Sequence, residues 1–170
     1  MRPPRLALAA RLRHLRLLWA VDQLRFIRGL ALELAANRSF RRRHPGFPLP
    51  PVDLAFDAYD HVNWQAYLDG GRAAARFIAD TLHRHRPDHG LRICEWGCGP
   101  ARVLRHLRDA LDDQTATLLG SDFNRRSIAW CRRHVPGIEF LENQLEPPLP
   151  LPTGGLDCIY AISVFTHLAV

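Results

Sequence analysis

The sequence contains no lysine, so arginine and histidine supply all of its basic side chains. Its four cysteines include no CxxC pair, which excludes a disulfide scaffold and predicts free thiols in a reducing, cytoplasmic compartment. No run of about 20 apolar residues is present, so a membrane-spanning helix is not expected. A metal site is not expected either, because His83, His85 and His89 lack a carboxylate or cysteine partner that would complete a coordination set.

Acidic residues are scarce in the first 50 residues, where eleven arginines stand against Asp22 and Glu33. Residues 51–170 reverse this balance, with twelve arginines and fifteen acidic residues. The net charge of +6 therefore comes from an N-terminal arm, while the rest of the chain is mildly acidic. Binding of nucleic acid through the globular part would require a basic patch there, so nucleic acid is a disfavoured partner.

The leucine spacing of residues 5–36 is typical of one or two amphipathic helices. The stripe consists of Leu8, Leu12, Leu15 and Trp19. Frequent arginines argue against a membrane span or a signal peptide. Two interpretations stay open: the helices pack on the domain or a protein partner, or they lie on an anionic membrane surface. We predict a basic helical arm over residues 1–44, separable from the ligand-binding part, and a Pro-rich linker over residues 45–56.

A further helix is expected from Trp64 to about Arg86, and from residue 91 short strands alternate with helices. The expected strands are Leu91–Glu95, Thr117–Gly120, Ile138–Leu141 and Leu156–Ile162, and the expected helices between them are Ala101–Leu111 and Asn124–His134. This alternation is typical of βαβ units. It predicts an α/β fold with a parallel sheet and helices on both of its faces.

Two glycines, Gly97 and Gly99, separate the first expected strand, which Glu95 closes, from the helix that follows. Such a loop lets the backbone approach a ligand, and a helix N-terminus offers N–H groups. Asp122 ends the second strand, where a carboxylate can accept both hydroxyls of a ribose. The pattern predicts an adenosine-like ligand. The alternative is that Asp122 only caps the next helix, a role that Asn124 could fill instead.

Arg102 discriminates between the adenosine ligands. A dinucleotide-binding fingerprint has a small residue three positions after its second glycine, and Arg102 occupies that position here. The bulky side chain argues against a nicotinamide or flavin dinucleotide. A nucleotide-dependent oxidoreductase is therefore an alternative rather than the favoured function.

The segment from Glu95 to Ala101 resembles the first motif of class I S-adenosylmethionine-dependent methyltransferases, with Ala101 in the last glycine position. The triplet 122–124 resembles their second motif, and residues 147–168 are similar to the fourth-strand region of the type 11/type 12 domain group. The resemblance covers roughly residues 57–168. It implies a partial Rossmann-like sheet of strand order 3-2-1-4, with residues 57–170 forming the N-terminal part of a methyltransferase domain truncated after the fourth strand.

The resemblance also implies S-adenosylmethionine as the cofactor and assigns roles to individual residues. Glu95, Gly97 and Gly99 would hold its methionine part, Asp122 its ribose, Phe123 the adenine ring and Asn143 the adenine amino group. His167 is a weak candidate for a catalytic base, for which a structural role is favoured.

We therefore expect a methyltransferase whose acceptor is a small molecule or a glycan. Residues 5–36 would supply any peripheral membrane or protein contact. The 170-residue chain alone is expected to be inactive, because the strands that complete the substrate side are missing. A non-catalytic or degenerate cofactor-binding module is the alternative from a different functional class.

Overall fold

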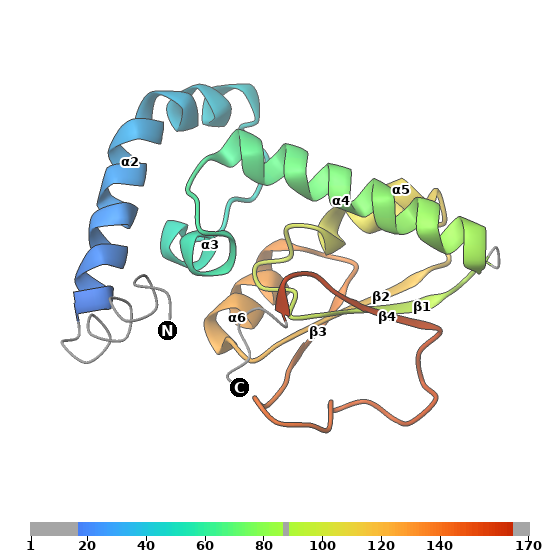
Figure 1. Cartoon of the computed structure of the whole chain (residues 1–170). Coiled ribbons are helices and arrows are strands. Elements are labelled where there is room, and N and C mark those ends of the chain that lie inside the picture. The colour runs from blue at the N-terminus through green and yellow to red at the C-terminus, as the bar shows by residue number, and fades with distance from the viewer. Residues whose placement is uncertain (1–16, 87–88, 165–170) are drawn as a thin grey trace, which may run out of the picture.

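The computed structural model of the chain describes residues 17–86 and 89–164 (Figure 1). The elements are α2 (Leu17–Arg43), α3 (Val52–Tyr59), α4 (Trp64–His85), β1 (Arg92–Trp96), the 3₁₀ helix η1 (Leu104–His106), α5 (Leu107–Leu111), β2 (Thr117–Asp122), α6 (Arg125–His134), β3 (Glu139–Glu142) and β4 (Cys158–Ala161). Most of the expected arm stripe, Leu8 to Leu15, lies outside the described residues, and so does His167.

The four strands form one parallel sheet in the order β3-β2-β1-β4. β1 is central, and its last residue, Trp96, pairs with Ser121 of β2 and Ala161 of β4. Because all strands run in the same direction, their carboxyl ends meet at one edge of the sheet, which is where α/β proteins place their ligands. The parallel sheet and its strand order confirm the Rossmann-like fold that the motifs implied.

Apolar side chains of the strands and of α4, α5 and α6 form a single core. The strands contribute Ile93, Leu118 and Phe140, and the helices contribute Leu82, Leu107 and Ile128. Each of these side chains is at most 6% exposed, so each contributes on the order of 1.5–3 kcal/mol through burial. In Figure 1, α4 and α5 run together along the sheet. Because Cys98 and Ala101 of the loop between β1 and η1 are also part of this core, the core fixes the position of that loop.

The helix expected over Ala101–Leu111 begins later than its sequence indicates. Ala101 has a φ of +53°, in the left-handed region, so the chain turns through residues 101–103 before η1 starts at Leu104. The expected strand Thr117–Gly120 extends to Asp122, and α6 begins at Arg125. These shifts matter because they place Asp122 on the strand itself rather than in the loop beyond it.

The segment expected as a linker, residues 45–56, is only partly a connection, because α3 begins at Val52. A second apolar cluster joins α2, α3 and α4 through Phe40, Ala55, Trp64, Tyr67 and Leu68, and Phe47 and Leu49 of the proline-rich segment pack against it. Phe40 and Tyr67 are both 0% exposed. The C-terminal part of the arm and the proline-rich segment therefore both supply apolar side chains to the cluster with α3 and α4.

Polar contacts tie the middle of α2 to the connection between α3 and α4. The Asn37 side chain donates to the carbonyl of Val62 at 2.7 Å and accepts from the Trp64 N–H at 2.9 Å. The Asn63 amide donates to the Glu33 carboxylate at 2.6 Å. These contacts fix the start of α4 relative to the arm, so the described part of the arm packs on the domain.

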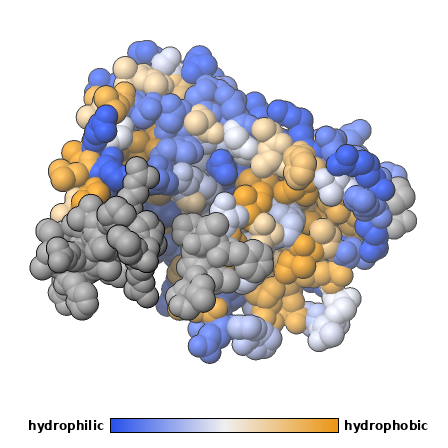
Figure 2. All heavy atoms as spheres, viewed as in Figure 1, coloured by the Kyte–Doolittle hydropathy of each residue, from blue (hydrophilic) through white to orange (hydrophobic). Residues whose placement is uncertain are grey.

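Several large apolar side chains of α2 are exposed among its charged residues (Figure 2). The exposed residues are Val21, Leu24, Ile27, Leu32 and Leu34. Figure 2 also shows apolar side chains over β4, where Ile159 is half exposed. Among the described residues, no helix is both long and apolar enough to cross a membrane.

Candidate functional site

The carboxyl ends of β1, β2 and β3 bring the predicted site residues to one place. The N–H groups of Gly97 and Cys98 both donate to the carbonyl of Ser121, at 2.7 and 3.0 Å, which joins the loop after β1 to the end of β2. The N–H of Asn143, just after β3, donates to the carbonyl of Asp122 at 3.1 Å. Three neighbouring strands therefore present their terminal residues to a common edge.

Asp122 is the centre of this arrangement and is 7% exposed. One carboxylate oxygen accepts from the N–H of Gly99 and the other from the N–H of Asn124, both at 2.7 Å. Burial raises the pKa of Asp122, and the two N–H donors oppose that increase. The Asn124 side chain, rather than Asp122, caps α6 by accepting from Arg126 and Ser127. Each carboxylate oxygen retains a second lone pair, so further donors such as hydroxyls can bind.

The loop after β1 requires three left-handed backbone conformations, at Gly97, Gly99 and Ala101. A Cβ on Gly97 would lie 2.3 Å from the Val164 side chain, and one on Gly99 would lie 3.3 Å from Ala58. Both glycines thus allow other segments to approach the loop closely. At Ala101 the same conformation costs about 1–2 kcal/mol, which accounts for glycine being the usual residue at this motif position.

The N–H groups of this loop are bound within the protein, which differs from the expected free helix N-terminus. Besides the bonds of Gly97, Cys98 and Gly99, the N–H of Ala101 donates to the carbonyl of Cys98 at 2.9 Å. The N–H of Leu104, at the start of η1, donates to the Glu95 carboxyl at 3.1 Å. Backbone carbonyls take up the other donors, so two acidic residues from adjacent strands, Asp122 and Glu95, hold the loop only through the N–H groups of Gly99 and Leu104.

Glu95 is buried, with 4% of its surface exposed. Desolvation raises its pKa to about 8, although the Leu104 N–H and nearby Tyr160 favour the ionised form. Tyr160 is its register partner on β4. At neutral pH the Glu95 carboxyl is therefore mostly protonated, and it acts as the acceptor that anchors η1.

Phe123 and Asn143 lie beyond β2 and β3 and differ in exposure. Phe123 is 60% exposed, whereas Asn143 is 8% exposed. The Asn143 amide nitrogen donates to the carbonyl of Gln144 at 2.6 Å, but its side-chain oxygen is buried without a hydrogen-bond partner among the described residues. An accessible aromatic face and a buried acceptor lacking a donor fit a purine ring with an exocyclic amino group.

Two tyrosines on the preceding helices, for which the sequence predicted no role at the site, hold the loop from the other side. The Tyr67 hydroxyl on α4 donates to the carbonyl of Pro100 at 2.8 Å. The Tyr59 hydroxyl on α3 accepts from the N–H of Arg102 at 3.3 Å. Burial raises the pKa of both tyrosines. Nothing in the spacing of two aromatic residues on amphipathic helices distinguishes such a role from core packing.

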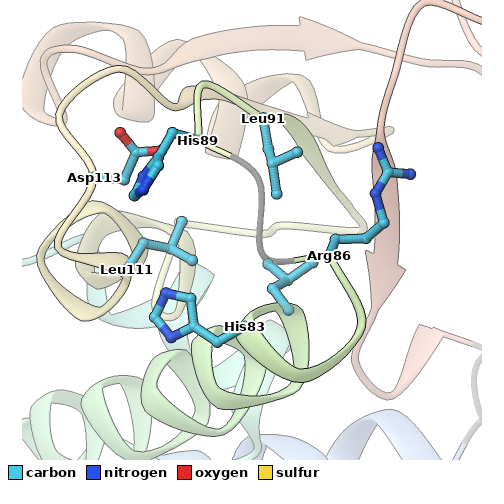
Figure 3. Close-up of a pocket in the computed structure, with 7 residues that line it drawn as sticks. His83, Arg86, His89, Leu91, Leu111 and Asp113 are labelled. Atoms are coloured by element: carbon cyan, nitrogen blue, oxygen red, sulfur yellow. The ribbon is translucent and has the colours of Figure 1, made fainter.

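The hollow drawn in Figure 3 lies at the opposite edge of the sheet, before β1 begins. His83, Arg86, Leu91, Leu111 and Asp113 are among its lining residues. Its volume of about 20 Å³ is enough for roughly one water molecule, far too small for a nucleoside. This hollow therefore cannot hold an adenosine-like ligand.

The model of the methyltransferase domain family matches residues 93–170, a segment that contains the glycine loop and, except for Arg92, the four strands. This part of the chain is therefore similar to methyltransferase domains. The resemblance of the motifs around Gly97 and Asp122 to class I methyltransferases is thereby confirmed. The helices α2, α3 and α4 precede the matched segment. α3 and α4 contact the glycine loop, α4 also joins the core beneath it, and α2 packs against α3 and α4.

Several solved structures are similar to this chain. A TehB-like SAM-dependent methyltransferase from Corynebacterium glutamicum is 22% identical, with 58% of this chain and 48% of that chain covered and a TM-score of 0.44. DesVI from Streptomyces venezuelae is 17% identical, with 62% and 42% covered and a TM-score of 0.46. Magnesium protoporphyrin IX methyltransferase from Synechocystis, with bound SAH, is 17% identical, with 78% and 57% covered and a TM-score of 0.43. The chain spans about half the length of these proteins.

Proposed function

We propose that this chain carries the cofactor-binding part of an S-adenosylmethionine-dependent methyltransferase. The observation that supports this most directly is the position of Asp122 at the carboxyl end of β2. It is buried and hydrogen-bonded to the N–H of Gly99, within a segment that matches the methyltransferase domain family. A carboxylate at this position, beside a glycine loop, is suited to the two hydroxyls of a ribose.

The surrounding residues fit the other parts of the same cofactor. Phe123 offers its exposed face to the adenine ring, and the buried oxygen of Asn143 can accept from the adenine amino group. Gly97 and Gly99 would lie against the methionine part, with Glu95 beneath them fixing the loop through Leu104. These assignments follow from the resemblance to class I methyltransferases, and the exposure of Phe123 and the unpaired Asn143 oxygen support them.

The cofactor, when bound, supplies a methyl group already activated on a sulfonium. The chain's own residues therefore need to align the acceptor and exclude water more than to provide covalent help. A hydroxyl or protonated amine acceptor would additionally require a base. His167, which lies outside the described residues, remains the weak candidate for that role.

We propose that the acceptor is a small molecule or a glycan rather than a nucleic acid. The distribution of charge supports this, because residues 51–170 contain more acidic residues than arginines. Phosphate backbones are bound through clustered basic side chains, which this part of the chain does not provide in excess.

Calorimetry with S-adenosylhomocysteine and with NAD tests the proposed function. We expect S-adenosylhomocysteine to bind and NAD not to bind at the same concentration. Asp122→Asn should weaken the binding, whereas Asp80→Asn, on the exposed side of α4, should leave it unchanged. Binding of NAD alone, or equal binding by the Asp122 variant, would contradict the proposal.

A further inference from the structure

A groove of about 350 Å³ lies between the middle of α2 and the segment that joins α3 to α4. Small-molecule sites occupy roughly 300–1,000 Å³, so the groove is large enough for a small organic ligand. All of its lining residues come from positions 25–63, before the strands begin. Figure 1 shows α2 standing beside α3 in this part of the molecule. The groove is therefore formed by the preceding helices and not by the carboxyl edge of the sheet.

The helix α3 separates this groove from the glycine loop. Phe56 of α3 lines the groove. Ala58 and Tyr59 lie on the loop side, each with an atom 3.3 Å from the position of a Cβ on Gly99. The Tyr59 hydroxyl also accepts from the N–H of Arg102. A ligand in the groove would thus occupy a different place from a ligand at the loop.

The groove has an apolar part. Leu32 of α2 is 68% exposed, and the centre of the Phe56 ring is 5.1 Å from that of Phe26. A Cβ on Gly29 would lie 3.3 Å from the Val62 side chain, so α2 is in close contact with the connection between α3 and α4. An apolar group that covered Leu32 and Phe56 would remove apolar surface from water, which favours binding.

The groove also contains two charges of opposite sign that are not neutralised within the described part of the chain. Arg28, exposed on α2, forms no hydrogen bond or ion pair with any described residue. The half-buried Glu33 carboxylate accepts from the Asn63 amide through Oε2 and has no cationic partner in the described ranges. Burial lowers the pKa of His61 below its usual 6.5, so this ring is neutral at neutral pH. The other two charged side chains of the groove bind each other; they are Arg25 and Asp60.

We propose that the groove is a second ligand site, which binds a free α-amino acid with an apolar side chain. Arg28 would bind the carboxylate, which matches the paired N–H donors of a guanidinium, and Glu33 would bind the ammonium group. The apolar side chain of the ligand would cover Leu32 and Phe56. A ligand with a single charge would leave Arg28 or Glu33 without a partner, so the two residues together favour a zwitterion. The inference goes beyond the proposed function and does not depend on cofactor binding.

The test uses L-phenylalanine, with 3-phenylpropionate and 2-phenylethylamine as analogues that lack the ammonium group and the carboxylate. In calorimetry on the full chain, L-phenylalanine should bind about fivefold or more tightly than either analogue. Arg28→Gln should weaken phenylalanine binding by about fivefold or more and leave phenylethylamine binding within about twofold. Glu33→Gln should weaken phenylalanine binding similarly and spare phenylpropionate. Arg38→Gln, exposed on the same helix and outside the groove, is the matched control.

Three results would overturn the inference. The first is no binding of L-phenylalanine at millimolar concentration, and the second is unchanged phenylalanine affinity in either variant. The third is displacement of bound phenylalanine by S-adenosylhomocysteine, which would place the amino acid at the cofactor edge. If phenylalanine binds as expected and S-adenosylhomocysteine does not bind, only the proposed function fails. Circular dichroism of each variant checks the fold, and the exposed Arg28 keeps the test decisive if Glu33→Gln, which alters the contact with Asn63, does not fold.

Discussion

The carboxylate of Asp122 accepts a hydrogen bond of 2.7 Å from the N–H of Gly99, twenty-three residues earlier in the chain. This bond joins the end of β2 to the loop after β1, and a second one, from Asn124, joins it to the start of α6. One side chain thereby sets the position of both segments that border the candidate cofactor site. Its structural role and its proposed role in binding ribose coexist, because each oxygen can accept more than one donor.

Asp122→Asn should therefore affect stability as well as binding. The amide directs an NH₂ group at one of the two backbone N–H donors, leaving that buried donor unsatisfied. We expect the free energy of unfolding to fall by about 1–3 kcal/mol in urea denaturation. Asp80→Asn should change it by less than about 0.5 kcal/mol. An Asp122 variant as stable as the unaltered protein would show that the two hydrogen bonds contribute little.

Glu95 gives the protein a defined dependence of stability on pH. Burial raises its pKa from 4.5 to about 8, so between these values the unfolded chain has lost the proton while the native protein keeps it. The contribution of Glu95 to the free energy of unfolding is therefore greatest at low pH, falls as pH rises through this interval, and levels off above about 8.

Glu95→Gln should remove this dependence while keeping an acceptor for the Leu104 N–H. We expect the variant to gain stability relative to the unaltered protein as the pH rises from 5 to 8, measured as the difference in melting temperature at each pH. Glu146→Gln, at an exposed position, should show a constant difference. If the difference in melting temperature between the Glu95 variant and the unaltered protein is the same at every pH, Glu95 is ionised in the native state.

Strand–helix alternation in the sequence was sufficient to predict the parallel sheet, and the resemblance of the motifs to class I methyltransferases implied its strand order and the closeness of Gly99 and Asp122. It did not predict α3, since Val52–Tyr59 follows a run of prolines that is typical of a linker. It also could not predict that Glu95 anchors η1, or that Tyr67 binds the Pro100 carbonyl. These contacts depend on how the helices pack over the loop, which no local spacing in the chain encodes. The predicted ligand contacts of Phe123 and Asn143 remain predictions.

A substitution at Phe40 tests whether the arm contributes to the stability of the fold. It lies on α2, within the region expected to be separable, yet it is 0% exposed and packs in the cluster that contains Tyr67. Phe40→Ala should lower the free energy of unfolding by about 3–5 kcal/mol. Leu24→Ala, on the same helix but 67% exposed, should lower it by less than about 0.5 kcal/mol. Equal, small effects in thermal unfolding would show that α2 contributes little to the core.

Gly71 provides the sharpest test of how α4 packs against the glycine loop. In an exposed helix interior, replacing glycine with alanine stabilises the helix by about 1 kcal/mol. At Gly71 the added Cβ would lie 2.2 Å from the carbonyl oxygen of Arg102, a backbone atom that cannot rotate away. The helix and the loop must therefore move apart, and overpacking of this kind costs about 1–3 kcal/mol or more. Because this cost exceeds the gain in helix propensity, we expect Gly71→Ala to be destabilising and to weaken S-adenosylhomocysteine binding through displacement of the loop.

Gly46→Ala, with no heavy atom within 4 Å of its Cβ, should leave both properties nearly unchanged. A stabilised Gly71 variant with full affinity would show that α4 does not press on the loop at Arg102.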